Sequence, residues 1–340
     1  MPDRMGVTAG TVYSLGSILV DVTVDVPRLP ERGGDVLATG TRTTPGGGFN
    51  LAVAVARQGV RCLYAAPHGT GPYGDLIRDA LAAEGVLVTA KRRADGDSGF
   101  TVTLVEPDGE RTFVTMPGVE AALESDDLAG LSPAARDIVS VSGYDLAYPG
   151  SGPVLAGWLD TLPDRVRVAL DPGPLIMEIP AARLSRVLGR IAILTLNQRE
   201  ARLLSGAGGA SGAGLLEAVR SRFRLLSAAE TAPRAPAVDA ARLRPAVDKG
   251  RRPSALVVVR EGPDGCVASG GPLGDRVVAV AAPAVHAVDT TGAGDAHTGV
   301  LLASLAAGHD VEAALRTATR AATISVTRVG PATTPTAAEL

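Results

Sequence analysis

Short runs of β-branched and aliphatic residues alternate with Ala- and Leu-rich stretches along most of this chain. Apolar strands that alternate with helices are typical of a parallel sheet with helices on both of its faces. The pattern therefore predicts an α/β protein with a mostly parallel sheet. The candidate strands are Thr11–Leu15, Arg61–Ala66, Ile138–Ser142, Val166–Asp171, Ile191–Leu196 and Leu256–Arg260, and the candidate helices between them include Asn50–Gln58, Gly74–Glu84, Gly152–Thr161 and Ala181–Leu188.

Two segments depart from this alternation, Leu19–Arg42 and Gly99–Met116. Both show the period-two pattern of strands with one exposed face, and in the second the run Pro107–Glu110 has the composition of a turn. Strands of this kind suit a small second sheet, which we expect to act as a lid over a cleft. A surface hairpin without function fits this segment equally well.

A third irregular segment, 206–254, is dominated by Ala, Gly, Arg and Pro. We interpret it as a surface insertion that is partly helical and partly mobile. It carries no functional signal.

Composition narrows the classes of function. The 340 residues have a formal net charge of −3, which argues against a nucleic-acid binder with its usual basic face. We find neither an apolar run of about eighteen residues nor a signal-peptide pattern, so we expect no membrane contact. Cys62 and Cys266 both lie in apolar stretches and are expected to be buried thiols in a reducing cytoplasm.

The run Ala287–Ala296 joins an apolar strand to a long Ala- and Leu-rich helix through a glycine-rich turn. Glycines at 292 and 294 allow a sharp turn, and the free N–H groups at the start of a helix favour phosphate oxygens. Asp295 in the first turn could accept a proton from an attacking hydroxyl. From the run alone, a helix-capping role for Asp295 fits equally well. The run lacks the Gly-Lys-Ser/Thr of a Walker A loop.

Two further runs combine turn residues with polar side chains. In Pro45–Gly59, three glycines precede Asn50, which is either an N-cap or an amide that binds a polyol. In Leu194–Leu204, Asn197 and Glu200 have the spacing of a capping box. The same pair could instead organise a hydrated Mg²⁺ beside nucleotide phosphates.

Together and in this order, the three runs resemble the ribokinase-like (PfkB) family of carbohydrate kinases, from about Thr11 to Gly330. The Asp-Thr-x-Gly-Ala-Gly-Asp motif is specific near a C-terminus, whereas the Asn-x-x-Glu run gains weight only from its position. The resemblance implies a doubly wound α/β sheet with a small β-sheet lid, and a cytoplasmic, ATP-dependent kinase that transfers phosphate to a sugar. It divides the chain into an α/β domain at 10–18, 46–98 and 117–335 and a lid at 19–45 and 99–116.

The resemblance also assigns roles to individual residues. Asp295 resembles the catalytic base, and Gly292, Ala293 and Gly294 resemble the anion hole that stabilises charge on the moving phosphoryl group. The positions that resemble sugar contacts are Asp21, Gly46, Gly47 and Asn50. Those implied at the nucleotide are Asn197, Arg260, Gly262, Gly265 and His297, with Asn197 and Glu200 placing Mg²⁺ through water. For His297, a packing role is equally compatible with the sequence.

Some relatives also hold a monovalent cation. The matching positions here are Asp289, Thr291, Ser325, Gly330 and Thr334, which makes K⁺ a candidate cofactor beside ATP and Mg²⁺. Dimeric relatives pair through the lid, so a homodimer is a further expectation.

This chain departs from ribokinases at the sugar. Phe49 is bulky where ribokinases carry a small residue, and the run from Ala147 to Gly150 lacks their acidic sugar contact. Phe49 and Tyr148 could stack on a sugar ring, which points away from ribose and towards a hexose, a nucleoside or a glycoside; both could also simply pack in the core.

Three rival functions follow. The first is a nucleoside kinase on the same scaffold, and the second is a regulator that binds sugar or nucleotide without catalysis. The third, a Rossmann dehydrogenase, requires Gly-x-Gly-x-x-Gly after an N-terminal strand, which this chain does not have.

Overall fold

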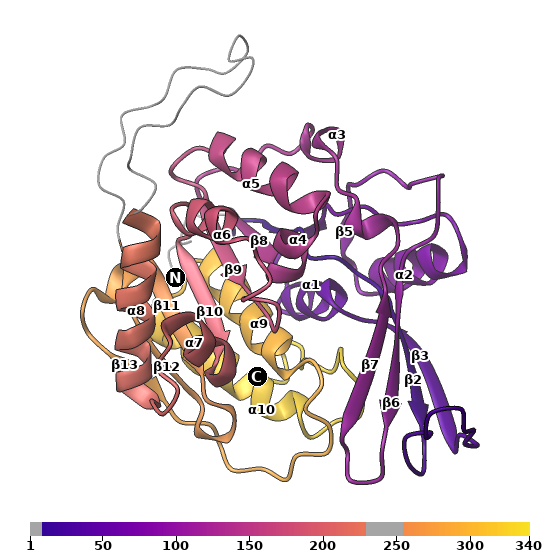
Figure 1. Cartoon of the computed structure of the whole chain (residues 1–340). Coiled ribbons are helices and arrows are strands. Elements are labelled where there is room, and N and C mark those ends of the chain that lie inside the picture. The colour runs from indigo at the N-terminus through magenta and orange to yellow at the C-terminus, as the bar shows by residue number, and fades with distance from the viewer. Residues whose placement is uncertain (1–8, 229–253) are drawn as a thin grey trace.

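The computed structural model describes residues 9–228 and 254–340 and shows two β-sheets of unequal size (Figure 1). Within the described residues, nine strands form the large sheet in the order β13-β12-β11-β10-β9-β8-β1-β4-β5. They are β1 (Val12–Ser14), β4 (Cys62–Tyr64), β5 (Leu87–Val88), β8 (Ile138–Ser142), β9 (Arg167–Asp171), β10 (Ile193–Asn197), β11 (Leu256–Arg260), β12 (Cys266–Ser269) and β13 (Val278–Val280).

All neighbouring pairs from β11 to β5 are parallel, and β12 and β13 extend the sheet antiparallel. The fold class expected from the alternation of strands and helices is confirmed. The antiparallel edge was not expected, because β12 and β13 are short and follow a glycine-rich turn.

The small sheet contains β2 (Val20–Asp25), β3 (Gly40–Pro45), β6 (Phe100–Val105) and β7 (Arg111–Met116), in the order β3-β2-β6-β7. Its strands come from the two segments with period-two patterning, and it stands to one side of the large sheet in Figure 1. On the outer strand β7, Phe113, Val114 and Met116 are exposed. The four-stranded lid is thus confirmed as part of the fold.

Helices cover both faces of the large sheet. They are α1 (Gly48–Ala56), α2 (Pro72–Ala83), α3 (Ser125–Leu128), α4 (Gly143–Ala147), α5 (Ser151–Thr161), α6 (Ala181–Leu188), α7 (Gln198–Ser205), α8 (Gly212–Ala228), α9 (Ala293–Ala306) and α10 (Val311–Ser325). One buried cluster joins the sheet to α1, α9 and α10, and a second joins it to α5, α6, α7 and α8. No helix in the described ranges is long and apolar enough to cross a membrane.

Helix α8 lies in the segment 206–254 that we interpreted as a surface insertion. Its Leu215, Leu216, Val219 and Phe223 are buried in the second cluster, so this part contributes to the core. The rest of the predicted insertion, residues 229–253, lies outside the described residues.

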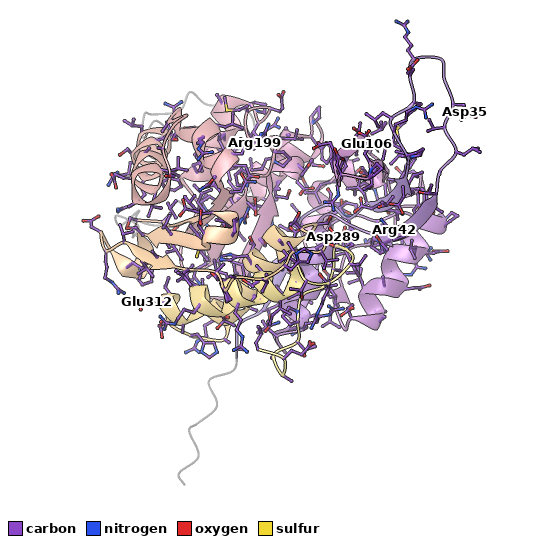
Figure 2. The ribbon with its side chains drawn as sticks, turned by 90° about the horizontal axis from the view of Figure 1, so that it is seen from below. Asp35, Arg42, Glu106, Arg199, Asp289 and Glu312 are labelled. Carbon is purple, nitrogen blue, oxygen red and sulfur yellow. The ribbon has the colours of Figure 1, made fainter. Side chains whose placement is uncertain are left out.

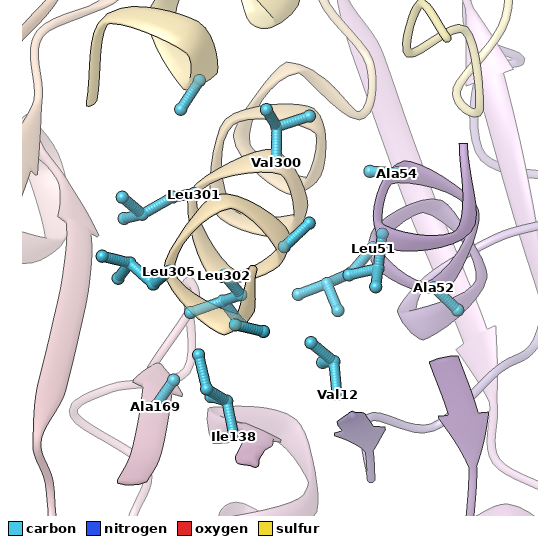
Figure 3. Close-up of a cluster of buried hydrophobic side chains, with 14 of the residues drawn as sticks. Val12, Leu51, Ala52, Ala54, Ile138, Ala169, Val300, Leu301, Leu302 and Leu305 are labelled. Atoms are coloured by element: carbon cyan, nitrogen blue, oxygen red, sulfur yellow. The ribbon is translucent and has the colours of Figure 1, made fainter. Parts of the chain in front are cut away.

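Helix α9 is central to the first cluster, since every residue from Ala296 to Ala306 is buried. Figure 3 shows its Val300, Leu301, Leu302 and Leu305 together with side chains of α1 and of strands β1, β8 and β9. Helix α1 approaches α9 closely at Gly299, where an added Cβ would lie 2.5 Å from the Ala54 Cβ and 2.8 Å from the Leu51 carbonyl oxygen. The two helices carry Asn50 and Asp295, so this contact sets the spacing of two candidate site residues.

We expect Gly299→Ala to destabilise the protein by about 1–3 kcal/mol, because the new methyl group overpacks the α1–α9 contact. Gly157→Ala in α5 is the matched control: its methyl group would come no closer than 3.9 Å to another residue, the Arg186 guanidinium. The control should gain about 0.5–1 kcal/mol from better helix propensity. Urea unfolding measures both, and equal stability of the two variants would contradict the tight contact.

Candidate functional site

The candidate site lies where parallel strands of the large sheet end. Strand β1 has β4 on one side and β8 on the other, so the strand order reverses at β1. In open α/β sheets, ligands bind outside the carboxyl ends of the strands at such a point. At this edge, Asp171, Asn197 and Arg260 are the last residues of β9, β10 and β11.

A glycine turn leads into α9 at this edge. Gly292 is left-handed (φ 73°), and an added Cβ would lie 2.0 Å from the Pro331 carbonyl oxygen, so only glycine fits. Ala293 N–H donates to the Thr290 carbonyl at 3.3 Å. In the described part of the chain, the N–H groups of Gly292, Gly294 and Asp295 have no protein acceptor. Unpartnered N–H groups at the start of a long helix make an anion-binding site.

Asp295 projects from the first turn of α9 and meets α1. The Asn50 amide nitrogen donates to Asp295 Oδ2 at 3.1 Å, across 245 residues of sequence. Burial, followed by the negative charge of Asp171, raises the pKa of Asp295 to about 7. Asn50 is only 5% exposed and its Oδ1 has no partner in the described structure, which leaves one buried acceptor open for a ligand. Asn50 and Asp295, predicted from separate motifs, therefore lie together.

Asp21 on β2 lies against the glycines before α1. A Cβ added to Gly46 would be 1.9 Å from Asp21 Oδ2, and one added to Gly47 (φ 60°) would be 2.7 Å from the Ser17 carbonyl oxygen. Burial raises the pKa of Asp21 to about 6. The charge of Asp21 also contributes to the raised pKa of Asp295, which places both carboxylates at one site. The glycines thus give room to the carboxylate of Asp21.

Phe49 and Tyr148, the two aromatic residues predicted to stack on a sugar ring, lie in different surroundings. Phe49 is 6% exposed and belongs to the core cluster, so its ring packs in the protein. Tyr148 is partly buried, and burial followed by the charges of Asp145 and Glu120 raises the pKa of its hydroxyl. Phe49 thus lies in a packing environment, whereas a sugar contact by Tyr148 stays a prediction.

Tyr144 was missed by sequence reasoning. It is the second residue of α4, which follows β8 directly, is 41% exposed, and would contact a Cβ on Gly173 at 3.6 Å. Burial, then the charges of Asp295, Glu200 and Asp21, raise the pKa of its hydroxyl, so these acids lie within electrostatic range of it. Its place after the strand next to the switch point was the signal that could have identified it.

Asn197 and Glu200 form a complete capping box at the start of α7. Asn197 Oδ1 accepts from Glu200 N–H at 2.9 Å, and Glu200 Oε2 accepts from Asn197 N–H at 2.8 Å. Asn197 Nδ2 also donates to Glu200 Oε1 at 2.7 Å, so both carboxylate oxygens have partners. In the described chain, no group of three His, Cys, Asp or Glu side chains could hold a metal ion. The capping role is thus observed, and the water-mediated role of the pair towards Mg²⁺ stays a prediction.

The other residues predicted at the nucleotide are spread around this edge. Gly262 (φ 61°) has open space beside it, whereas a Cβ on Gly265 would lie 2.0 Å from the Val280 carbonyl oxygen. His297 is 4% exposed and lies 3.5 Å from Thr319 Oγ1 on α10. Burial and then Arg260 lower its pKa to about 3, so it is a neutral, packed side chain.

Asp289 connects the turn before α9 to the lid. Its Oδ1 accepts from Thr291 N–H at 2.9 Å, from Thr291 Oγ1 at 2.7 Å and from Arg111 Nη2 of β7 at 2.7 Å, and its Oδ2 accepts from Gly330 N–H at 3.1 Å. Burial opposes ionisation, but these hydrogen bonds lower the pKa of Asp289 to about 2. Figure 2 labels Asp289 near the centre of the molecule.

Three of the backbone oxygens predicted to hold K⁺ accept hydrogen bonds from the protein. The carbonyls of Ser325 and Gly330 accept from Thr333 Oγ1 at 3.0 and 3.3 Å. Thr334 is buried, and its carbonyl accepts from Arg57 at 2.8 Å. The K⁺ site stays a prediction.

We compared the sequence with known protein families and proteins. Residues 10–337 match the model of the pfkB family carbohydrate kinases. The chain is 33% identical over 302 residues to an uncharacterized sugar kinase of Escherichia coli, YegV, covering 88% of this chain and 84% of that protein.

Solved structures share the fold. Arabidopsis thaliana ribokinase, complexed with ribose and ATP, has a TM-score of 0.76 at 23% identity and covers 97% of both chains. Burkholderia thailandensis nucleoside kinase, in complex with inosine, has a TM-score of 0.68 at 19% identity, over 97% of this chain and 94% of that one. Since the family model spans nearly the whole chain and its motif residues meet at one edge of the sheet, this chain belongs to the pfkB family of carbohydrate kinases.

Proposed function

We propose that this kinase phosphorylates a hydroxyl of a sugar or sugar-like substrate with ATP, with Asp295 as the general base. One observation carries the proposal: the Asp295 carboxylate and the unpartnered N–H groups of Gly292 and Gly294 share the first turn of α9. A proton acceptor and an anion site this close together can act on the attacking hydroxyl and on the phosphoryl group that it receives.

The remaining polar groups of the site suit a polyol. Asn50 holds Asp295 with its amide nitrogen and offers its open Oδ1 to a substrate hydroxyl. Asp21, beside Gly46, can accept hydrogen bonds from further hydroxyls. Tyr144, which is 41% exposed, could offer its ring. A sugar has both hydroxyls and an apolar ring face, so these groups together favour this class.

The nucleotide would lie on the other side of the α9 turn, near Asn197 and Gly262. This is supported by the fold shared with the Arabidopsis ribokinase that was solved with ATP. Mg²⁺, when bound with the nucleotide, neutralises phosphate charge; here it would be held mainly by phosphates and water, with Glu200 acting through water. K⁺ stays a further candidate cofactor, at the backbone oxygens predicted from sequence.

A nucleoside substrate is the second candidate, and the fold shared with the nucleoside kinase solved with inosine favours it. A binding protein without catalysis is the third, and the intact Asp295–Asn50 contact speaks against it. The exposed face of β7 keeps a lid-to-lid homodimer as a prediction. The two buried free cysteines fit the cytoplasmic location that we expected.

The direct test is ADP release from ATP and Mg²⁺ in the presence of a panel of sugars and nucleosides. We expect a sugar to stimulate ADP release, and Asp295→Asn to reduce the stimulated rate by about 100- to 10,000-fold, as is typical for loss of a general base. ATP binding, measured by calorimetry, should change little.

Asp310→Asn is the matched control, since Asp310 caps α10 away from the site and Asn caps equally well. Its rate should equal that of the wild type. Stimulation by nucleosides alone would favour the second candidate. Full activity of Asp295→Asn would remove Asp295 from the base role, and no stimulation by any acceptor would contradict the kinase reaction itself.

The pKa of Asp295 predicts the pH dependence. A general base acts in its ionised form, so kcat should rise about ten-fold per pH unit below pH 7 and level off above pH 8. Steady-state rates from pH 5.5 to 9 measure this profile. A flat profile, or a rate that falls as the pH rises through 7, would contradict it.

A further inference from the structure

Arg260 is the last residue of β11, and its side chain is 11% exposed. Its guanidinium lies next to Gly294 in the α9 turn. Its Nη1 donates to Asp171 Oδ2 at 2.7 Å, to Thr195 Oγ1 at 2.8 Å and to Thr298 Oγ1 at 2.7 Å. These acceptors belong to β9, β10 and α9. One guanidinium nitrogen thus joins three elements that carry the site.

The rest of the guanidinium lies against the anion site. Its Cζ and Nη2 are 3.6 Å from the position of a Cβ on Gly294, and Nη2 is 3.7 Å from Glu200 Oε2. Thr298 follows Asp295 by three residues on α9, so the two side chains share one helix face. Arg260 is therefore hydrogen-bonded to α9 through Thr298, one helical turn after Asp295, which we propose as the base.

The contacts of Arg260 point inward. Nη1 carries two hydrogens and already serves three acceptors. Moving this nitrogen to another partner would break its bond to the partly buried Asp171, and leaving a buried charge unpaired is costly. Nη1 is therefore committed to the protein and not to the nucleotide, for which the resemblance implied Arg260.

We propose that Arg260 is a positioning residue of the kinase: a fixed internal cation that orients Asp171 and α9 and keeps the neighbouring carboxylate of Asp295 available as the base. The inference rests on the proposed function, because it assigns Arg260 a task in the chemistry of Asp295. It does not require that Arg260 touch either substrate.

The charges around Asp295 agree with this role. Asp171 and Asp21 raise its pKa, whereas Arg260 and the hydrogen bond from Asn50 lower it. The other titratable groups that face this region are Glu200 of α7, Tyr144 of α4 and His297 of α9, which is neutral. Arg260 is the positive charge among these causes, and after the Asn50 hydrogen bond it lowers the pKa most, so its removal should raise the pKa of Asp295.

The test is the pH profile of kcat for three variants. Arg260→Met should move the midpoint upward by about one pH unit, the size expected for one lost neighbouring charge, and leave the KM for ATP within about three-fold. Asp171→Asn should move the midpoint downward. The double variant Asp171→Asn/Arg260→Met should return it close to that of the wild type, because the two opposing charges are removed together.

Arg167→Met is the matched control: Arg167 starts β9 at the opposite end of the strand, where it donates to the carbonyls of Arg136 and Leu305. Its profile should not change. If Arg260→Met alone does not fold, Asp171→Asn and the double variant still test the opposition of charges.

Two results would overturn the inference. A ten-fold or larger rise in the KM for ATP with an unchanged pH midpoint would show a phosphate contact. Lower stability with an unchanged midpoint would show a purely structural role. A wild type without any turnover would instead refute the proposed function, so the two failures are distinguishable.

Discussion

The close contact between α1 and α9 at Gly299 sets the geometry on which the site depends. The two helices meet where only a hydrogen atom fits, and they sit on the same face of the large sheet. One helix begins next to Asn50 and the other next to Asp295, so backbone packing brings the amide within 3.1 Å of the carboxylate. The site is therefore positioned by the core and not by its loops.

The charges and burial of the site then set the pKa values of the acids that packing has brought together. Asp21, Asp171, Glu200 and Asp295 gather at this site. Burial raises the pKa values of Asp21, Glu200 and Asp295, and the negative charge of Asp171 adds to the rise at Glu200 and Asp295. A buried guanidinium, the N–H groups of α9 and a capping amide offset this negative charge. An arrangement of acids with raised pKa values beside an anion site is typical of a centre that moves protons and phosphoryl groups.

An ion pair joins the lid to this centre. Arg111 reaches from β7 to Asp289, which in turn accepts hydrogen bonds from the backbone of Thr291 and Gly330. Asp289 precedes the α9 turn by only a few residues, so this contact connects the lid to the turn that forms the anion site. Closure of such a lid excludes water from phosphoryl transfer.

Periodicity was enough to predict the two sheets and the helices on both faces, since burial on both faces of a sheet leaves a continuous apolar pattern. The family, and the common site of Asn50 and Asp295, followed from the resemblance of three motifs to known kinases. Sequence could not decide between capping and ligand binding, because Asn197 and Glu200 satisfy the same spacing in either role. Nor could it show that Phe49 is buried, that Tyr144 lies near the acids, or that Arg260 bonds to three neighbouring elements. Those outcomes depend on which neighbours long-range packing supplies, and only the folded chain brings Asp171, Thr195 and Thr298 around one guanidinium.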